Sequence, residues 1–100
     1  ASIQVLTDVK NLEQAKMKFS VFPNPFSEAF MLNLILTEPA ELSIIVTDVL
    51  GNEMAFLVNR KYFRAGPHEF ELEASYWPSG VYLVFLASDD GKVVQKVVKR

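Results

Sequence analysis

The chain has 100 residues, of which 50% are hydrophobic and 22% are charged. This length fits one domain with a modest core, and this composition excludes intrinsic disorder. The net charge of −2 gives no electrostatic reason to expect nucleic acid as a partner. Because the chain has no cysteine, a disulfide scaffold and a thiolate metal site are excluded.

No apolar stretch approaches the ~20 residues that a membrane-spanning helix requires, so we expect no direct membrane insertion. The first residue is Ala1, and no charged segment leads into an apolar run, so no signal peptide is expected. We expect the chain to be part of a longer protein whose export signal lies upstream.

Residues 1–18 are more polar than the rest and show no alternation. We predict a linker over residues 1–18 and a folded domain over residues 19–100. The first predicted strand, residues 19–22, ends at Pro23-Asn24-Pro25. Since proline lacks a backbone donor, this strand is expected at a sheet edge.

Beyond this motif, Phe30, Leu32, Leu34 and Leu36 alternate with Met31, Asn33 and Ile35, and the first set is expected to face the core. A break at Glu38-Pro39 precedes a predicted strand over residues 42–47. The segment from Asp48 to Gly51 predicts a type I turn in which Asp48 caps its own backbone and Gly51 takes a positive φ. The chain is then expected to return as a hairpin over residues 53–58.

The next break, at Gly66-Pro67, is followed by three further predicted strands. In the first of these, Phe70 and Leu72 alternate with glutamates, so one face of the strand is expected to be exposed to solvent. Residues 81–86 are apolar on both faces, which indicates a central strand. Asp90-Gly91 predicts a hairpin that leads into a last strand over residues 92–99.

These signals predict an all-β fold, a small Ig-like antiparallel β-sandwich of about seven strands. "Ig-like" describes the architecture alone, because the cysteine and tryptophan marks of an antibody domain are missing. The predicted core comprises Leu32, Leu34, Ile44, Val46, Phe70, Leu72, Tyr82 and Val84.

Catalytic chemistry is poorly supported, and we expect no catalytic residue, no metal site and no cofactor. The single histidine, His68, starts a strand just after a turn, and none of the common nucleophile, phosphate or zinc motifs occurs. The spacing around Asp89 and Asp90 does not match an EF-hand loop and fits turn chemistry better. Glu69, Glu71 and Glu73 are interpreted as a solvated strand face.

Four aromatic residues invite a carbohydrate-binding hypothesis: Tyr62, Phe63, Tyr76 and Trp77. The simpler interpretation is core and corner packing, with the Trp77-Pro78 turn placing the Trp77 ring on the end of the core. A surface adhesion or carbohydrate-binding module appended to a secreted enzyme stays open as the alternative function.

The last nine residues mix β-branched side chains with cations. One interpretation is an edge strand protected from aggregation by charge. The other is an exposed strand end, with a free carboxylate, that a receptor reads through backbone pairing. The residues alone leave both open.

The turn motifs also carry a resemblance to a known family. Phe22 precedes Pro23-Asn24-Pro25, and Asp48 and Gly51 follow in an Asp-x-x-Gly turn. An Ala-Gly-x-His segment and a Trp-Pro-Ser-Gly-Val-Tyr segment come next, and the chain ends in a Lys-Val-Val-Lys tail. In order and spacing these resemble the C-terminal sorting domain, type A, of the type IX secretion system (Por secretion system). The matching motif positions are Pro23, Asn24, Pro25, Asp48, Gly51, Gly66, Gly80 and Tyr82. Thr47 and Trp77 depart from the pattern, standing where an aromatic residue and leucine are common.

The resemblance implies a C-terminal secretion signal that directs a larger cargo through the type IX outer-membrane translocon with the help of an outer-membrane shuttle protein. It further implies removal by a sortase-like peptidase that cuts in the linker. The cargo would pass through the periplasm to the cell surface or exterior of a Bacteroidetes-type bacterium. The residues implied in receptor recognition are Lys96, Val97, Val98, Lys99 and Arg100.

Overall fold

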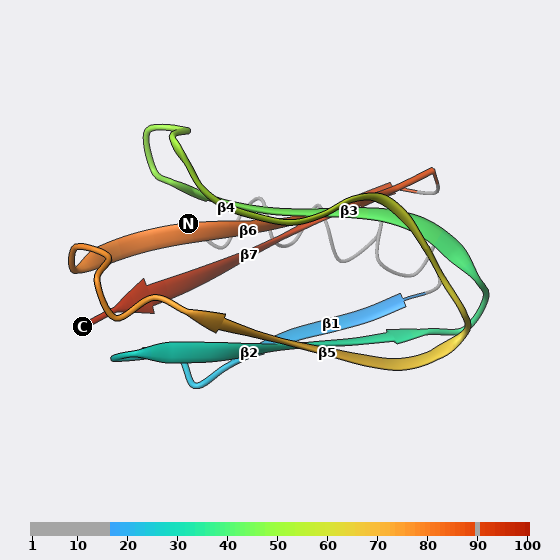
Figure 1. Cartoon of the computed structure of the whole chain (residues 1–100), viewed down its shortest axis with the longest axis horizontal. Coiled ribbons are helices and arrows are strands. Elements are labelled where there is room, and N and C mark those ends of the chain that lie inside the picture. Colours follow the sequence, from blue (N-terminus) through green and yellow to red (C-terminus); the bar gives the residue numbers. More distant parts are fainter. Residues whose placement is uncertain (1–16, 90) are drawn as a thin grey trace.

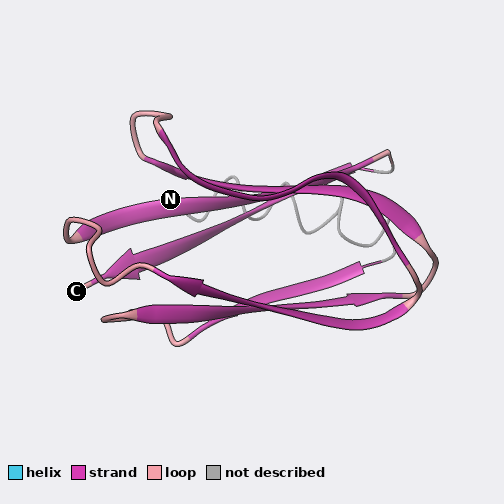
Figure 2. Cartoon of the chain, viewed as in Figure 1, coloured by secondary structure: helices cyan, strands magenta, loops and turns pink. Residues whose placement is uncertain are grey.

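A computed structural model describes residues 17–89 and 91–100, which form two antiparallel sheets packed face to face (Figure 1). The strands are β1 (Met17–Phe22), β2 (Ala29–Leu36), β3 (Ala40–Asp48), β4 (Glu53–Phe63), β5 (Gly66–Glu73), β6 (Gly80–Ser88) and β7 (Gly91–Lys99). One sheet has the order β1-β2-β5 and the other β4-β3-β6-β7. Strands and loops make up all of the described chain (Figure 2). The predicted all-β sandwich is confirmed.

Several strand boundaries differ from the sequence-based expectation; for example, β3 begins at Ala40 and not at Leu42, and β6 ends at Ser88 and not at Leu86. β1 begins at Met17 and not at Phe19, because Met17 lies opposite Leu36 and is buried at 3% exposure. β4 continues to Phe63 and does not end near Val58, since it pairs with β3 over its whole length. Most of the expected linker, residues 1–16, lies outside the described residues, as does Asp90 at the tip of the last hairpin.

The core fills the space between the inner faces of the two sheets, where every second residue of each strand points inward. All predicted core residues are buried except Phe70 and Leu72, which are half-buried and pack against the core from β5. β5 is an edge strand of its sheet, and its side chains keep some contact with water. The buried hydrophobic residues are Met17, Val21, Phe26, Phe30, Leu32, Leu34, Leu36, Leu42, Ile44, Val46, Ala74, Trp77, Tyr82, Val84, Leu86, Val93 and Val97.

The predicted positions of strands in the sheets are also confirmed. β1 is an edge strand and ends at Phe22, immediately before the first proline. β6 lies between β3 and β7, as its apolar faces predicted, and β5 alternates between half-buried and exposed side chains. β7 is the other edge of the larger sheet.

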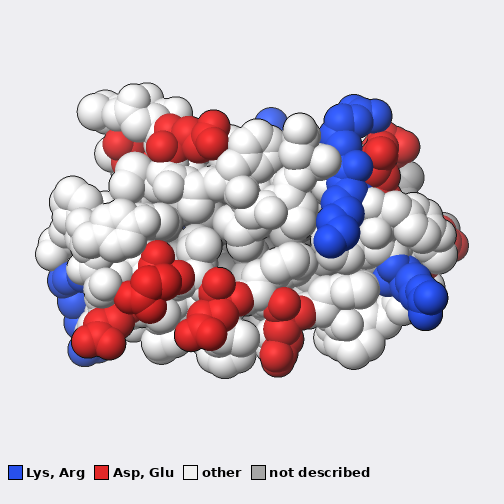
Figure 3. Space-filling model, in the orientation of Figure 1, with Lys and Arg blue, Asp and Glu red and all other residues white. Residues whose placement is uncertain are grey.

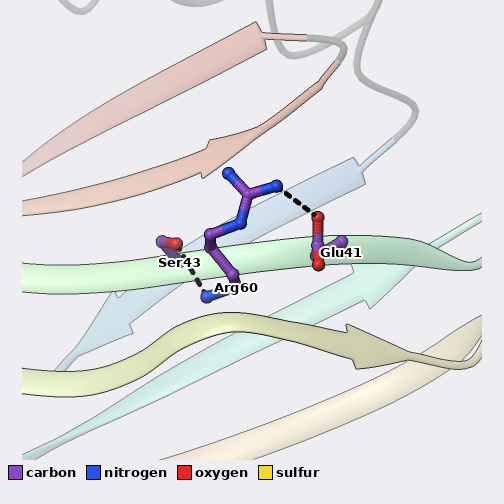
Figure 4. A network of polar contacts seen from close by, with 3 residues as sticks. All are labelled: Glu41, Ser43 and Arg60. Atoms are coloured by element: carbon purple, nitrogen blue, oxygen red, sulfur yellow. Dashed lines mark hydrogen bonds and ion pairs between the residues drawn. The ribbon is translucent and has the colours of Figure 1, made fainter.

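The pairing of β3 with β4 contains register shifts, and the Ser43 side chain accepts a backbone N–H there. Arg60 has a positive φ of 54°, and its N–H donates to the hydroxyl of Ser43 at 2.9 Å (Figure 4). The Arg60 guanidinium also contacts Glu41 Oε1 at 3.2 Å. Because this ion pair is exposed, we expect it to contribute at most about 1 kcal/mol to stability.

In the described part of the chain, no helix has the length and apolar character that crossing a membrane requires.

Candidate recognition surface

The family-like motifs, with one exception, gather at a single end of the sandwich. The strand registers place Asp48 opposite Tyr82, Tyr82 opposite Val97, and Gly80 opposite Lys99. The loop between β1 and β2 and the β3–β4 turn also lie at this end, on the left in Figure 1, where the C-terminus is marked. We call this region the motif end.

The exception is the Ala-Gly-x-His segment at the opposite end. Gly66 lies opposite Leu36, far from the last residues of β7. The His68 ring contacts the Phe63 ring at 5.1 Å between centroids, and His68 Nε2 hydrogen-bonds the carbonyl oxygen of Arg64 at 2.8 Å. These contacts tie the β4–β5 connection to β5.

The β3–β4 turn at the motif end is held by Asp48, as predicted. Its Oδ1 accepts the N–H groups of Leu50 and Asn52, each at 2.9 Å, and its Oδ2 accepts the Asn52 side-chain amide at 3.0 Å. The Gly51 N–H donates to the Asp48 carbonyl oxygen at 3.1 Å, and Gly51 has a φ of +93°. The hydrogen bonds from Asn52, side chain first, hold the pKa of Asp48 below its usual value. This turn presents Val49 and Leu50 at 63% and 84% exposure.

A second corner of the motif end is built on Trp77 and Tyr82. Trp77 is buried at 4% exposure, and its ring contacts those of Phe26 and Tyr82 with centroids 6.4 Å and 4.8 Å away. The Tyr82 hydroxyl donates to the Pro78 carbonyl oxygen. Burial, with a smaller effect of the Asp48 charge, raises the pKa of Tyr82. The predicted packing of Trp77 on the end of the core is confirmed.

The four aromatic residues of the carbohydrate hypothesis do not share a face. Trp77 is buried at the motif end, and Phe63 packs on Phe70 with centroids 5.9 Å apart. Tyr62 and Tyr76 are exposed, but Tyr62 lies opposite Glu41 at the other end of the sandwich. A continuous stacking surface from these residues is therefore not formed.

The outer edge of β7 is occupied by the Pro-Asn-Pro segment. Asn24 Nδ2 donates to the Lys96 carbonyl oxygen at 3.0 Å, and the Val98 N–H donates to Asn24 Oδ1 at 2.9 Å. The Phe26 N–H donates to the Val98 carbonyl oxygen at 2.8 Å, and the Arg100 N–H donates to the Phe26 carbonyl oxygen at 2.9 Å. Phe26 and Lys99 thus form a parallel bridge. We call these contacts of Asn24 and Phe26 the edge clamp.

Two hollows flank these elements. The first, of about 480 Å³, is lined by Pro23, Pro25, Ser27, Glu28, Ala29 and Arg100. The second, of about 250 Å³, lies between the β3–β4 turn and the start of β6, with Leu50, Met54 and Pro78 in its lining.

Sequence comparison decides the family. Residues 20–100 match the profile of the family described as secretion system C-terminal sorting domain. The chain belongs to this family. A sorting domain of this kind is a type IX secretion signal, so its protein is secreted or held at the cell surface and interacts with the type IX machinery. The sorting-domain family is not catalytic.

A search among curated proteins gave no match to the sorting domain. Among solved structures, the X-ray structure of the endo-beta-1,4-mannanase from Thermotoga petrophila aligns with a TM-score of 0.49 and 14% sequence identity. That alignment covers 85% of this chain and 19% of the mannanase chain.

The last residues of the sorting domain differ from one another in exposure. Val97 is fully buried and belongs to the core, Lys96, Val98 and Lys99 are half-buried, and Arg100 is exposed. One of the two interpretations left open by the sequence requires a free outer backbone edge here, and the edge clamp occupies that edge at Lys96, Val98 and Arg100. No local pattern indicated Phe26 as part of this arrangement, because its backbone partners, Val98 and Arg100, lie at the far end of the chain.

Charge is unevenly distributed over the sorting domain. Figure 3 shows a row of acidic side chains over β5, where Glu69, Glu71 and Glu73 are exposed, and cationic side chains at the left, near the C-terminus. Among the described residues, no three His, Asp or Glu side chains come close enough together to hold a metal ion. The glutamates alternate along one strand, as a solvated strand face does.

Proposed function

We propose that the motif end is the surface through which the type IX translocon and its outer-membrane shuttle protein recognise this domain on a larger cargo protein. Lys96, Val98, Lys99 and Arg100 supply the recognised side chains, and Val97 anchors their strand in the core. The observation that carries the proposal is the meeting of motifs from Pro23 to the last residue at one end of the sandwich.

The rigidity of the motif end supports this role. A recognition surface gains affinity when its groups are held in place before binding. The Asp48 turn, the Tyr82 corner and the edge clamp each fix a loop or strand end by named hydrogen bonds. The loops therefore offer a defined shape to a partner.

We further propose that the cargo crosses the periplasm before export and that a sortase-like peptidase then removes the domain by cutting in the linker. β1 begins at Met17, and a cut inside β1 would remove an edge strand whose Met17 and Val21 are buried. We therefore infer that the cut falls before Met17.

The test is an export assay in a host with type IX machinery. Residues 1–100 are fused to a fluorescent reporter that carries a Sec signal, and the reporter is measured in periplasm, surface and medium. A version ending at Lys96 is expected to accumulate in the periplasm. Equal surface or medium levels for the truncated and full-length fusions would contradict recognition through this segment.

Truncation also removes Val98 and Arg100 from the edge clamp, so a charge variant is needed beside it. Arg100→Glu reverses a charge that lines a hollow at the motif end. Lys92→Glu is the matched control, because Lys92 is exposed on the same strand at the opposite end. We expect Arg100→Glu to reduce export several-fold and Lys92→Glu to export as the unchanged fusion does.

A further inference from the structure

The Asn24 side chain imitates a strand residue in the edge clamp. In parallel pairing, one residue donates its N–H to a carbonyl and accepts an N–H from the residue two positions further on. Phe26 does this with its backbone toward Val98 and Arg100. Asn24 does the same with its side-chain amide toward Lys96 and Val98. The amide therefore extends a short parallel ladder by one rung along β7.

This ladder is anchored in the core by Phe26. Its side chain is 1% exposed, and its ring lies 4.8 Å from that of Phe30 and 6.4 Å from that of Trp77, between centroids. Opening the ladder by moving the segment away would bring this aromatic ring into water, which is unfavourable. The closed arrangement is thus the stable one for the free domain.

Because the outer edge of residues 96–100 is already paired, it limits how a partner can bind this segment. Addition of a strand requires unpaired N–H and C=O groups along the edge. The carbonyl of Lys96, both backbone groups of Val98 and the N–H of Arg100 already have partners. A receptor that paired with them would first have to displace Asn24 and expose Phe26.

We propose that Asn24 is a positioning residue for recognition: with Phe26 it seals the backbone edge of residues 96–100, so that the partner reads side chains on a closed edge and does not add a strand. This inference rests on the proposed function. The alternation of β7 places Lys96 and Val98 on its outer face, opposite to buried Val97. Arg100 lines the hollow beside the two prolines.

The chemistry of these groups defines the partner surface. Lys96 and Arg100 are positively charged and would pair with carboxylates on the partner, whereas Val98 and the two prolines would pack against apolar groups. The partner surface that fits residues 96–100 is therefore a protein surface with acidic groups around an apolar centre. The side-chain donor and acceptor of Asn24 are both occupied by the edge clamp, so Asn24 does not contact the partner through them.

The first measurement tests the clamp by amide hydrogen exchange on residues 1–100. Asn24→Ala removes both side-chain hydrogen bonds, and we expect the Val98 amide to exchange roughly tenfold faster or more. Ser43→Ala is the matched control, because it also removes one exposed side-chain hydrogen bond to a backbone N–H, at a distance from β7. Val98 exchange is expected to be unchanged in that variant. Unaltered Val98 exchange in Asn24→Ala overturns the clamp.

The second measurement tests recognition with the reporter fusions. We expect Asn24→Ala to lower export several-fold and Ser43→Ala to leave it unchanged, with both compared at equal folded fraction from urea unfolding. If the partner instead adds a strand, the freed edge would make Asn24→Ala export as well as the unchanged fusion or better, which overturns the proposal. Should Asn24→Ala fail to fold, Asn24→Asp replaces it, since Asp keeps the acceptor for Val98 and loses the donor to Lys96.

The outcomes separate this inference from the function on which it rests. If the unchanged fusion stays in the periplasm, the proposed function fails, and the recognition role of Asn24 fails with it. If the unchanged fusion is exported and Asn24→Ala is exported equally, only the positioning role fails.

Discussion

The substitution Phe26→Ala is expected to destabilise the domain strongly, because Phe26 joins the edge clamp to the core. The side chain is 1% exposed and makes edge-to-face contacts with Phe30 and Trp77. Truncation of a buried phenylalanine to alanine costs about 3 to 5 kcal/mol, which includes the cavity left behind. Each lost aromatic pair accounts for about 0.5 to 1.5 kcal/mol beyond buried area. We therefore expect a loss of about 4 kcal/mol.

This loss is large against the ~5 to 15 kcal/mol that stabilises a typical domain. Urea unfolding followed by the fluorescence of Trp77, the single tryptophan, measures it directly. For a chain of this size, about 1 kcal/mol corresponds to roughly 4 to 8 °C in Tm, so the melting temperature should fall by at least about 16 °C.

Phe22→Ala is the control within the same segment. Phe22 is 45% exposed at the end of β1, so its removal is expected to cost about 1 kcal/mol. An equal, small effect of the two substitutions, with unchanged Trp77 fluorescence, would refute the packing of Phe26 against the core and with it the anchoring of the edge clamp.

Three further predictions concern the fold and the β3–β4 turn. Leu34→Ala should cost about 2 to 5 kcal/mol in urea unfolding because Leu34 is fully buried, whereas Ile35→Ala, at a position 48% exposed, should cost far less; comparable losses would contradict the register of β2. Gly51→Ala should cost about 1 to 2 kcal/mol because the φ of +93° disfavours a Cβ, although no atom lies within 4 Å of it; an unchanged urea midpoint would argue against this turn geometry. The pKa of Asp48 is lowered in the folded state, so its contribution to stability is present above its unfolded pKa of 3.8 and is lost as the pH falls through the folded pKa. The stabilities of the unchanged domain and Asp48→Asn should therefore converge in acid, and a difference that stays constant from about pH 7 to about pH 2 would contradict the hydrogen bonding of Asp48.

Much of the fold follows from local sequence patterns. Alternation placed Leu32, Leu34, Ile44 and Val46 in the core, because successive strand residues point to opposite faces. The Asp48 turn was predictable for a similar reason. Its hydrogen bonds reach only as far as residue 52, and Gly51 is the residue type that takes a positive φ most readily.

The order of strands and the state of their edges depend on contacts between distant segments. The hydrogen bond from Asn24 to Lys96 joins residues 72 positions apart, and nothing in the local pattern of either segment indicates the other. The sequence therefore left the outer edge of the last strand undecided, because a cationic, β-branched sequence looks the same whether that edge is open or paired.

By itself, the sequence determined the all-β class, the positions of the turns, the inward faces of the strands and, through its ordered motifs, the sorting-domain family. Only the tertiary structure decided that the motifs meet at one end, that Val97 is buried and that Asn24 and Phe26 close the edge of β7. The physical reason is the range of the forces involved. Side-chain alternation and turn chemistry act within a few residues, whereas pairing of edges is settled by packing of the whole chain around one core.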